Sequence, residues 1–186
     1  MTRTLILGGA RSGKSALAER LAHSSGKDVV YVATSHAGDA EMAARIAHHR
    51  ARRPQTWTTV EEPTALAATL RAQCAPGRIV LVDCLTLWLT NLMFAAHQEY
   101  PDVGTIALPP LFVHEREALL EWLDTPPAGD VVFVSNEVGM GIVPSGAVSR
   151  TFVDEAGRLH QDVAARCARV LFVAAGLPLA LKGAPC

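Results

Sequence analysis

The sequence predicts an α/β fold with a mainly parallel sheet flanked by helices, and two observations lead to it. First, short β-rich runs alternate with longer Ala-rich helical stretches, which is typical of parallel strands joined by right-handed crossovers. Second, several of the short runs are continuously apolar, as expected for strands buried on both faces. The expected strands are Thr4–Leu7, Val29–Ala33, Thr56–Val60, Ile79–Val82, Val131–Ser135 and Val170–Ala174.

Helical patterns lie between these runs, and the chain length suits one domain with one core, residues 1–186. The expected helices are Lys14–Ser24, Asp39–Arg52, Pro63–Gln73, Leu111–Leu123 and Ser149–Cys167. Proline and glycine mark His97–Pro110 as a mobile loop or an insertion, and Asp124–Asp130 as a turn before a strand. We expect Lys182–Cys186 to be a frayed end.

The composition excludes several classes of function. With 17 basic and 18 acidic residues, the chain lacks the excess of positive charge that is typical of proteins that bind nucleic acid or an anionic membrane. The longest apolar stretch, Val170–Leu181, is too short to span a bilayer, and no signal peptide fits the first residues. The cysteines show neither a C-x-x-C pair nor a zinc spacing, so we expect a reduced, cytoplasmic chain. They are Cys74, Cys84, Cys167 and Cys186.

The strongest motif is a phosphate-binding loop (P-loop) between the first expected strand and helix. It reads Gly8-Gly9-Ala10-Arg11-Ser12-Gly13-Lys14-Ser15 and matches G-x-x-x-x-G-K-[ST] at every defined position. Glycines let successive backbone N–H groups surround a phosphate, and the helix N-terminus adds partial positive charge. Lys14 is expected to reach the β- and γ-phosphates, and the Ser15 hydroxyl to ligate Mg²⁺.

A carboxylate at the end of a later apolar strand completes this pattern. The apolar run Ile79–Val82 ends in Asp83, which would hold the metal ion at the carboxyl edge of the sheet. The alternative is that Asp83 caps the next helix. The N-K-x-D motif of guanine-reading switch proteins is absent. The residues therefore indicate a P-loop NTPase or kinase without saying which.

A histidine-bearing helix is the other unusual feature. Basic residues recur on one stripe of the expected helix Asp39–Arg52, namely Arg45, His49 and Arg52 or Arg53, with His48 beside it. Such a face could attract triphosphate oxygens. His48 and His49 point about 100° apart, so they do not converge on one metal ion. The helix is either a solvated basic surface or a site of nucleophilic catalysis, in which a neutral imidazole attacks phosphorus. Spacing alone leaves both open.

Taken together, these blocks resemble the adenosylcobinamide kinase/adenosylcobinamide-phosphate guanylyltransferase family of cobalamin biosynthesis. The resemblance covers nearly the whole chain in order. Beyond the P-loop, the matching stretches are Tyr31–Ser35, Glu41–His49, Arg53-Pro54, Trp57, Asp83–Leu92 and Ser135–Pro144.

The family implies a RecA-like P-loop domain assembled as a homo-oligomer, expected to be a trimer. It also implies two reactions on corrinoid substrates. The hydroxyl of the aminopropanol arm of adenosylcobinamide takes the γ-phosphate of ATP or GTP. GTP then gives GMP to adenosylcobinamide-phosphate, forming adenosylcobinamide-GDP and releasing pyrophosphate.

The resemblance also assigns residues. The family passes GMP through a covalent histidine adduct, so His48 becomes the expected nucleophile, acting with Lys14 as the catalytic pair. The GTP site would be lined by Gly8, Gly9, Ala10, Arg11, Ser12, Gly13, Lys14, Ser15, Thr34, Ser35, His36, His49, Arg50, Ala51, Arg52, Glu61 and Asp83. For Thr34, Ser35, His36 and Glu61 the resemblance is the only basis.

Some positions depart from the family pattern, and two rival functions remain. His160 stands where the family more often has Asn, and Ala168 replaces a common acidic residue. The Gly-rich segment Asn136–Pro144 either shapes the corrinoid side or is an ordinary connector.

A kinase with one activity would not need His48. A non-catalytic nucleotide switch would be expected to carry a guanine motif.

Overall fold

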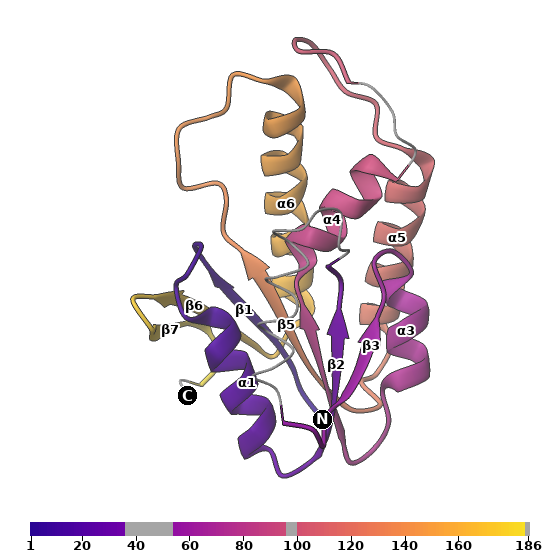
Figure 1. The fold of residues 1–186 in the computed structure, drawn as a ribbon, viewed down its shortest axis with the longest axis vertical. Helices are drawn as coiled ribbons and strands as arrows, with labels where there is room; N and C mark the ends of the chain where they lie inside the picture. Colours follow the sequence, from indigo (N-terminus) through magenta and orange to yellow (C-terminus); the bar gives the residue numbers. More distant parts are fainter. Residues whose placement is uncertain (36–53, 96–99, 185–186) are drawn as a thin grey trace.

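The computed structural model describes residues 1–35, 54–95 and 100–184, and their strands form one seven-stranded sheet (Figure 1). The strand order is β3-β2-β4-β5-β1-β6-β7. All neighbours are parallel except β6 and β7, which form an antiparallel pair at one edge. The strands are β1 (Arg3–Gly8), β2 (Asp28–Ala33), β3 (Thr58–Glu61), β4 (Arg78–Asp83), β5 (Asp130–Asn136), β6 (Arg169–Ala174) and β7 (Leu177–Lys182).

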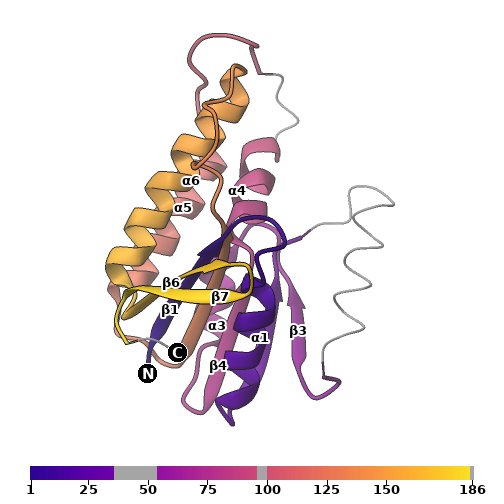
Figure 2. The ribbon, with the colours of Figure 1, turned by 90° about the vertical axis from the view of Figure 1, so that its left-hand side faces the viewer.

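Helices of the described residues cover both faces of this sheet (Figure 2). One face packs against α1 (Lys14–Ser24). The other face packs against α3 (Leu66–Gln73), α4 (Leu85–Phe94), α5 (Pro110–Asp124) and α6 (Ala147–Arg166). Side chains alternate along each strand, so neighbours such as Leu5 and Ile6 lie in different core layers. This double burial is why the strands read as continuous apolar runs.

The predicted architecture is confirmed, and two elements escaped prediction. One is α4, whose residues Leu85, Trp88, Leu89 and Leu92 are all fully buried. A helix that is apolar on nearly every side shows no amphipathic period, so its pattern does not separate it from a strand. The expected helix Asp39–Arg52 lies outside the described residues.

The other missed element is β7, which pairs with β6 through the two-residue turn Ala175-Gly176. Both turn residues have positive φ, 52° and 80°, as in the primed turns that suit the twist of a hairpin. The prediction of a frayed end is wrong at Lys182, which is the last residue of β7. Its Nζ donates to the carbonyls of Ala164 and Ala165, near the C-terminus of α6.

The register of the strands determines which residues meet at the carboxyl edge of the sheet. Gly8 at the end of β1 lies opposite Asn136 of β5 and Val173 of β6. Asp83 at the end of β4 lies opposite Ala33 of β2 and beside β5. In open α/β sheets, ligands bind outside this edge. Among the described helices, none is long and apolar enough to cross a membrane.

Candidate active site

The loop between β1 and α1 curls back on itself through backbone hydrogen bonds. Ser12 N–H donates to the Gly9 carbonyl (3.2 Å), and Leu17 N–H donates to the Gly13 carbonyl (2.9 Å). Arg11 and Gly13 adopt left-handed conformations with φ of 55° and 97°. This path surrounds the N-terminus of α1, where free N–H groups favour an anion.

Gly8 of the loop has no room for a side chain, and Gly13 has little. A Cβ on Gly8 would lie 2.5 Å from the Val173 carbonyl oxygen and 2.6 Å from Ser12 Oγ. A Cβ on Gly13 would lie 3.1 Å from the Cα of Gly176. Gly176 N–H also donates to the Ser12 carbonyl (2.8 Å), so the β6–β7 turn braces the loop. Sequence reasoning missed Gly176, although a two-residue turn between apolar runs is a recognisable hairpin signal.

Lys14 is the buried cation of this site. Its side chain reaches back across the loop, and Nζ donates to the Gly9 carbonyl (3.2 Å). Burial lowers the pKa of Lys14, and the nearby Asp83 carboxylate partly offsets this. The Ser12 hydroxyl is buried and has no hydrogen-bond partner in the described part of the chain. A buried cation with spare donors and an unsatisfied hydroxyl fit a phosphate-bearing ligand.

Asp83 and Ser15 are the candidate metal ligands, and their chemistry fits magnesium. Tyr31 Oη donates to Asp83 Oδ2 (2.8 Å), which holds the half-buried carboxylate at the sheet edge. No side-chain hydrogen bond caps α4, so the described contacts do not support the helix-cap alternative for Asp83. Residues 1–35, 54–95 and 100–184 contain no cluster of three His, Cys, Asp or Glu that could hold a metal ion.

The side chain of Thr34 bonds to the protein's own backbone. It is fully buried, and its Oγ1 donates to the Cys84 carbonyl and accepts from Cys84 N–H, both at 2.8 Å. The Thr34 side chain therefore ties the end of β2 to the end of β4. Burial, with the charge of Asp83, raises the Cys84 pKa to about 11, so this thiol is neutral and unsuited to nucleophilic attack.

The remaining predicted residues lie apart or outside the described residues. Ser35 is half-buried just after β2. Glu61 ends the edge strand β3, four strand spacings from β1, or roughly 19 Å at about 4.8 Å per spacing. Glu61 could thus contact only a part of the nucleotide that is remote from the loop phosphates. The residues outside the described ranges are His36, His48, His49, Arg50, Ala51 and Arg52.

The end of β5 contributes polar groups between the P-loop and Asp83. Asn136 Nδ2 donates to Thr86 Oγ1 (3.2 Å). Glu137 N–H donates to the Gly8 carbonyl (3.0 Å), and Glu137 Oε1 accepts from Gly139 N–H (2.6 Å). The segment 137–146, here called the β5–α6 loop, then leaves the sheet edge. Three large apolar side chains are exposed along it, those of Met140, Ile142 and Val143.

A buried histidine lies behind this loop. His160 Nε2 is 2.7 Å from Ser135 Oγ, and its Nδ1 is 3.9 Å from Glu137 Oε2. Burial lowers the pKa of His160, and the Glu137 carboxylate partly offsets this. A neutral imidazole is therefore favoured. His160 thus contacts the end of β5 directly.

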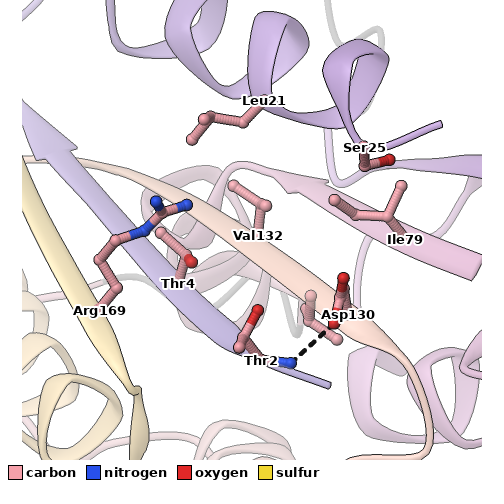
Figure 3. A pocket seen from close by; sticks show the side chains of 9 residues that line it. Thr2, Thr4, Leu21, Ser25, Ile79, Asp130, Val132 and Arg169 are labelled. Atoms are coloured by element: carbon pink, nitrogen blue, oxygen red, sulfur yellow. Dashed lines mark hydrogen bonds between the residues drawn. The ribbon is translucent and has the colours of Figure 1, made fainter. Parts of the chain in front are cut away.

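A small pocket elsewhere in the fold is separate from this site. Its volume is about 130 Å³, and Thr4, Asp130 and Arg169 line it beneath the C-terminal end of α1 (Figure 3). These residues lie near the amino ends of β1, β5 and β6, at the edge of the sheet opposite the P-loop. The pocket is not where the phosphate-binding groups converge.

Comparison with known proteins agrees with this geometry. Residues 4–181 match the profile of the family described as "Cobinamide kinase / cobinamide phosphate guanyltransferase". The chain is 59% identical over 183 residues to the "Bifunctional adenosylcobalamin biosynthesis protein CobP" of Pseudomonas aeruginosa, covering 98% of this chain and 99% of that protein. It is 42% identical over 180 residues to the "Bifunctional adenosylcobalamin biosynthesis protein CobU" of Escherichia coli K12, covering 96% and 98%.

Solved structures support the fold alone. A type III secretion ATPase of pathogenic bacteria aligns with a TM-score of 0.57 at 15% identity, covering 96% of this chain and 56% of that one. The ATPase EscN of enteropathogenic E. coli aligns with a TM-score of 0.53 at 14% identity, covering 94% and 43%. The chain has the RecA-like P-loop NTPase fold that its sequence predicts.

Proposed function

The chain belongs to the cobinamide kinase/cobinamide phosphate guanyltransferase family, and from this premise we propose how its residues carry out two successive transfers to one corrinoid. The enzyme phosphorylates adenosylcobinamide and then adds GMP to the phosphate, in cobalamin biosynthesis. The rival of a kinase alone has no support, because the family description joins both activities. The observation that carries the proposal is the buried Lys14 within a loop shaped for phosphate.

In the kinase reaction, the P-loop holds the triphosphate of ATP or GTP. The acceptor oxygen attacks the γ-phosphorus, and the bond to the β–γ bridging oxygen breaks, so a nucleoside diphosphate leaves. Lys14 neutralises charge on the β- and γ-phosphates, and backbone N–H groups from Gly9 to Ser15 orient them. Ser15 and Asp83 would hold Mg²⁺, which supplies further charge neutralisation when bound.

In the guanylyl reaction, His48 is the nucleophile. Its imidazole attacks the α-phosphorus of GTP, a P–N bond forms, and pyrophosphate leaves. An oxygen of adenosylcobinamide-phosphate then attacks the same phosphorus, and the P–N bond breaks. The resemblance supports a GTP site that also includes Thr34, Ser35, His36, His49, Arg50, Ala51, Arg52 and Glu61. The buried Thr34 side chain would act by fixing the strand ends rather than by touching the nucleotide.

Assembly and compartment complete the proposal. We expect residues 1–186 to form one domain, which one shared sheet supports, and to assemble as a homo-oligomer, a trimer. Exposed Leu177, Leu179 and Leu181 on the edge strand β7 support association between copies. The cysteines of the described residues are free thiols, which supports a reducing cytoplasmic location.

The test follows two labels through the two reactions. With Mg²⁺ and ATP labelled at the γ-phosphate, adenosylcobinamide should become labelled. With GTP labelled at the α-phosphate, adenosylcobinamide-phosphate should become labelled. His48→Ala should keep the first transfer and lose at least about a thousandfold in the second, since removing a nucleophile abolishes the covalent route.

A matched control is His114→Ala, which removes an exposed histidine of α5 and should preserve both transfers. If His48→Ala transfers GMP at the rate of the unaltered protein, then the nucleophile is another residue. If the unaltered protein labels neither corrinoid, the proposed function itself fails.

A further inference from the structure

The two reactions place different demands on the acceptor. In the kinase reaction the acceptor is an aliphatic hydroxyl, which is un-ionised near pH 7 and must lose a proton as it attacks phosphorus. In the guanylyl reaction the acceptor is a phosphate monoester, which is already largely ionised because its second pKa is about 6. Only the first reaction therefore needs a general base.

Glu137 is the acidic residue whose backbone the strand order places beside the P-loop. It directly follows β5, which lies between β1 and β4, and its N–H donates to the Gly8 carbonyl (3.0 Å). The acceptor must reach the γ-phosphate from outside the edge formed by Gly8, Asn136 and Asp83. Glu137 is adjacent to that edge, and its side chain is 21% exposed, so a substrate can reach it.

The other carboxylates near this edge, among the residues that the structure describes, are committed elsewhere. Asp83 accepts from Tyr31 and is the proposed metal ligand. Glu62 Oε1 accepts from the N–H groups of Thr64 and Ala65 at 2.9 and 2.7 Å, which holds the chain just before α3. Glu61 lies on the far edge strand. Within residues 1–35, 54–95 and 100–184, Glu137 remains as the carboxylate next to the loop.

The Glu137 carboxylate is held in one orientation. Oε1 accepts from Gly139 N–H (2.6 Å), which leaves Oε2 as the oxygen available to a substrate. His160 Nδ1 lies 3.9 Å behind Oε2, too far for a direct hydrogen bond but within reach through a bridging water. A fixed carboxylate loses little freedom when the acceptor arrives, which favours proton transfer.

The order Ser135, His160, Glu137 resembles a hydrolase triad in residue types, but it cannot act as one. Ser135 Oγ is 2.7 Å from His160 Nε2, yet Ser135 is completely buried. Because its hydroxyl is already bonded to His160 and none of its surface is exposed, Ser135 is not open to a corrinoid or a nucleotide. His160 and Ser135 therefore lie behind Glu137 and support it, and Glu137 is the one residue of the three that is open to solvent.

We propose that Glu137 is a catalytic residue of the kinase reaction and takes the proton of the acceptor hydroxyl; this inference rests on the proposed function. The hydroxyl oxygen forms its bond to the γ-phosphorus as the bond to the β–γ bridging oxygen breaks. The nucleoside diphosphate leaves with that electron pair. The proton passes to Glu137 Oε2 and then to solvent.

The experiment compares the two reactions in Glu137→Gln. Glutamine keeps an oxygen for Gly139 N–H, so the loop should keep its shape while the base is lost. Phosphorylation of adenosylcobinamide from labelled ATP should fall by about 10²–10⁴ in kcat, the range of general-base catalysis. Transfer of GMP to separately supplied adenosylcobinamide-phosphate should stay within about twofold.

Two further variants make the outcome decisive. Glu137→Asp keeps a carboxylate and should retain more kinase activity than Glu137→Gln. Glu117→Gln removes an exposed carboxylate of α5 and should change neither reaction. Equal losses in both reactions, or no kinase loss in Glu137→Gln, would overturn the inference. An unaltered protein without kinase activity would instead refute the proposed function.

Discussion

Two loops leave the same edge of the sheet, and they are built in opposite ways. The P-loop after β1 is formed by backbone hydrogen bonds around Gly8 and Gly13, with the buried Lys14 folded across it. The β5–α6 loop points large apolar side chains into solvent, and Ile142 is 97% exposed. The first loop offers a fixed shape that suits the constant triphosphate group. The second offers side chains, which suit one particular acceptor.

The anchoring of the two loops differs as well. The P-loop is braced by the β6–β7 turn through Gly176. The β5–α6 loop is held at its ends, by Glu137 and Gly139 at the start and by Arg150, which donates to the carbonyls of Pro144 and Ser145. Substitutions should therefore damage the two loops in different ways.

The largest expected effect comes from filling the close contact beneath the P-loop. In Gly8→Val, the new side chain would meet the Val173 carbonyl and Ser12, so the backbone must move. A shift of about 1 Å can cost about 100-fold in rate, so both transfers should fall by at least that factor. The overpacking should also destabilise the fold by about 1–3 kcal/mol, measurable by thermal unfolding.

Gly157→Ala is the matched control, because a Cβ at this α6 position meets nothing within 4 Å. It should preserve both transfers and stabilise the helix slightly. If Gly8→Val behaved like this control, the P-loop would not be the rigid region that the comparison requires.

A smaller effect is expected on the exposed loop. Ile142→Ser removes apolar surface that we expect to cover part of the corrinoid, worth about 1–2 kcal/mol. The KM for adenosylcobinamide should rise about 5–30-fold, while the KM for ATP and the thermal midpoint stay the same. Val113→Ser removes an exposed apolar side chain of α5 and should leave both KM values unchanged. An unchanged corrinoid KM in Ile142→Ser would make the loop a plain connector.

The smallest effect concerns the buried support of the second loop. His160 has a pKa below its ordinary value of 6.5 because burial disfavours the charged imidazole, and the neighbouring Glu137 carboxylate partly offsets this. Below about pH 6.5 the unfolded chain binds a proton that folded His160 resists, so stability is complete above this pH and falls below it. In His160→Asn, the drop in thermal midpoint from pH 7.5 to pH 5.5 should become smaller.

His114→Asn, at an exposed position on α5, should reproduce the pH dependence of the unaltered protein. Should His160→Asn keep the full drop in its thermal midpoint, the buried imidazole would not be the source of acid sensitivity.

The sequence predicted what local patterns encode. The bounds of α1, Lys14–Ser24, follow from the P-loop motif and the helix signals after it, and six strands follow from short β-rich runs, several of them apolar throughout. It missed α4, which lacks an amphipathic period, and β7, whose hairpin turn was concealed within one apolar stretch. Both errors arise where hydrophobicity alone does not distinguish one structure from another.

The candidate site likewise contains residues that the sequence could identify and contacts that it could not. Lys14, Ser15 and Asp83 could be named because a motif or a strand end marks each of them. The contact between Glu137 and Gly8 could not be predicted, since it depends on β5 inserting between β1 and β4. The inward role of Thr34 depends likewise on the pairing of β2 with β4. Long-range strand order is not written in any local pattern.

The most direct test of the account is to find where GMP becomes attached. The protein would be incubated with Mg²⁺ and GTP in the absence of a corrinoid, digested at alkaline pH, and mapped by mass spectrometry. We predict one guanylyl group per chain, acid-labile and alkali-stable, on the imidazole of His48. A guanylyl group on another residue, or none in a protein that still transfers GMP to adenosylcobinamide-phosphate, would contradict the account.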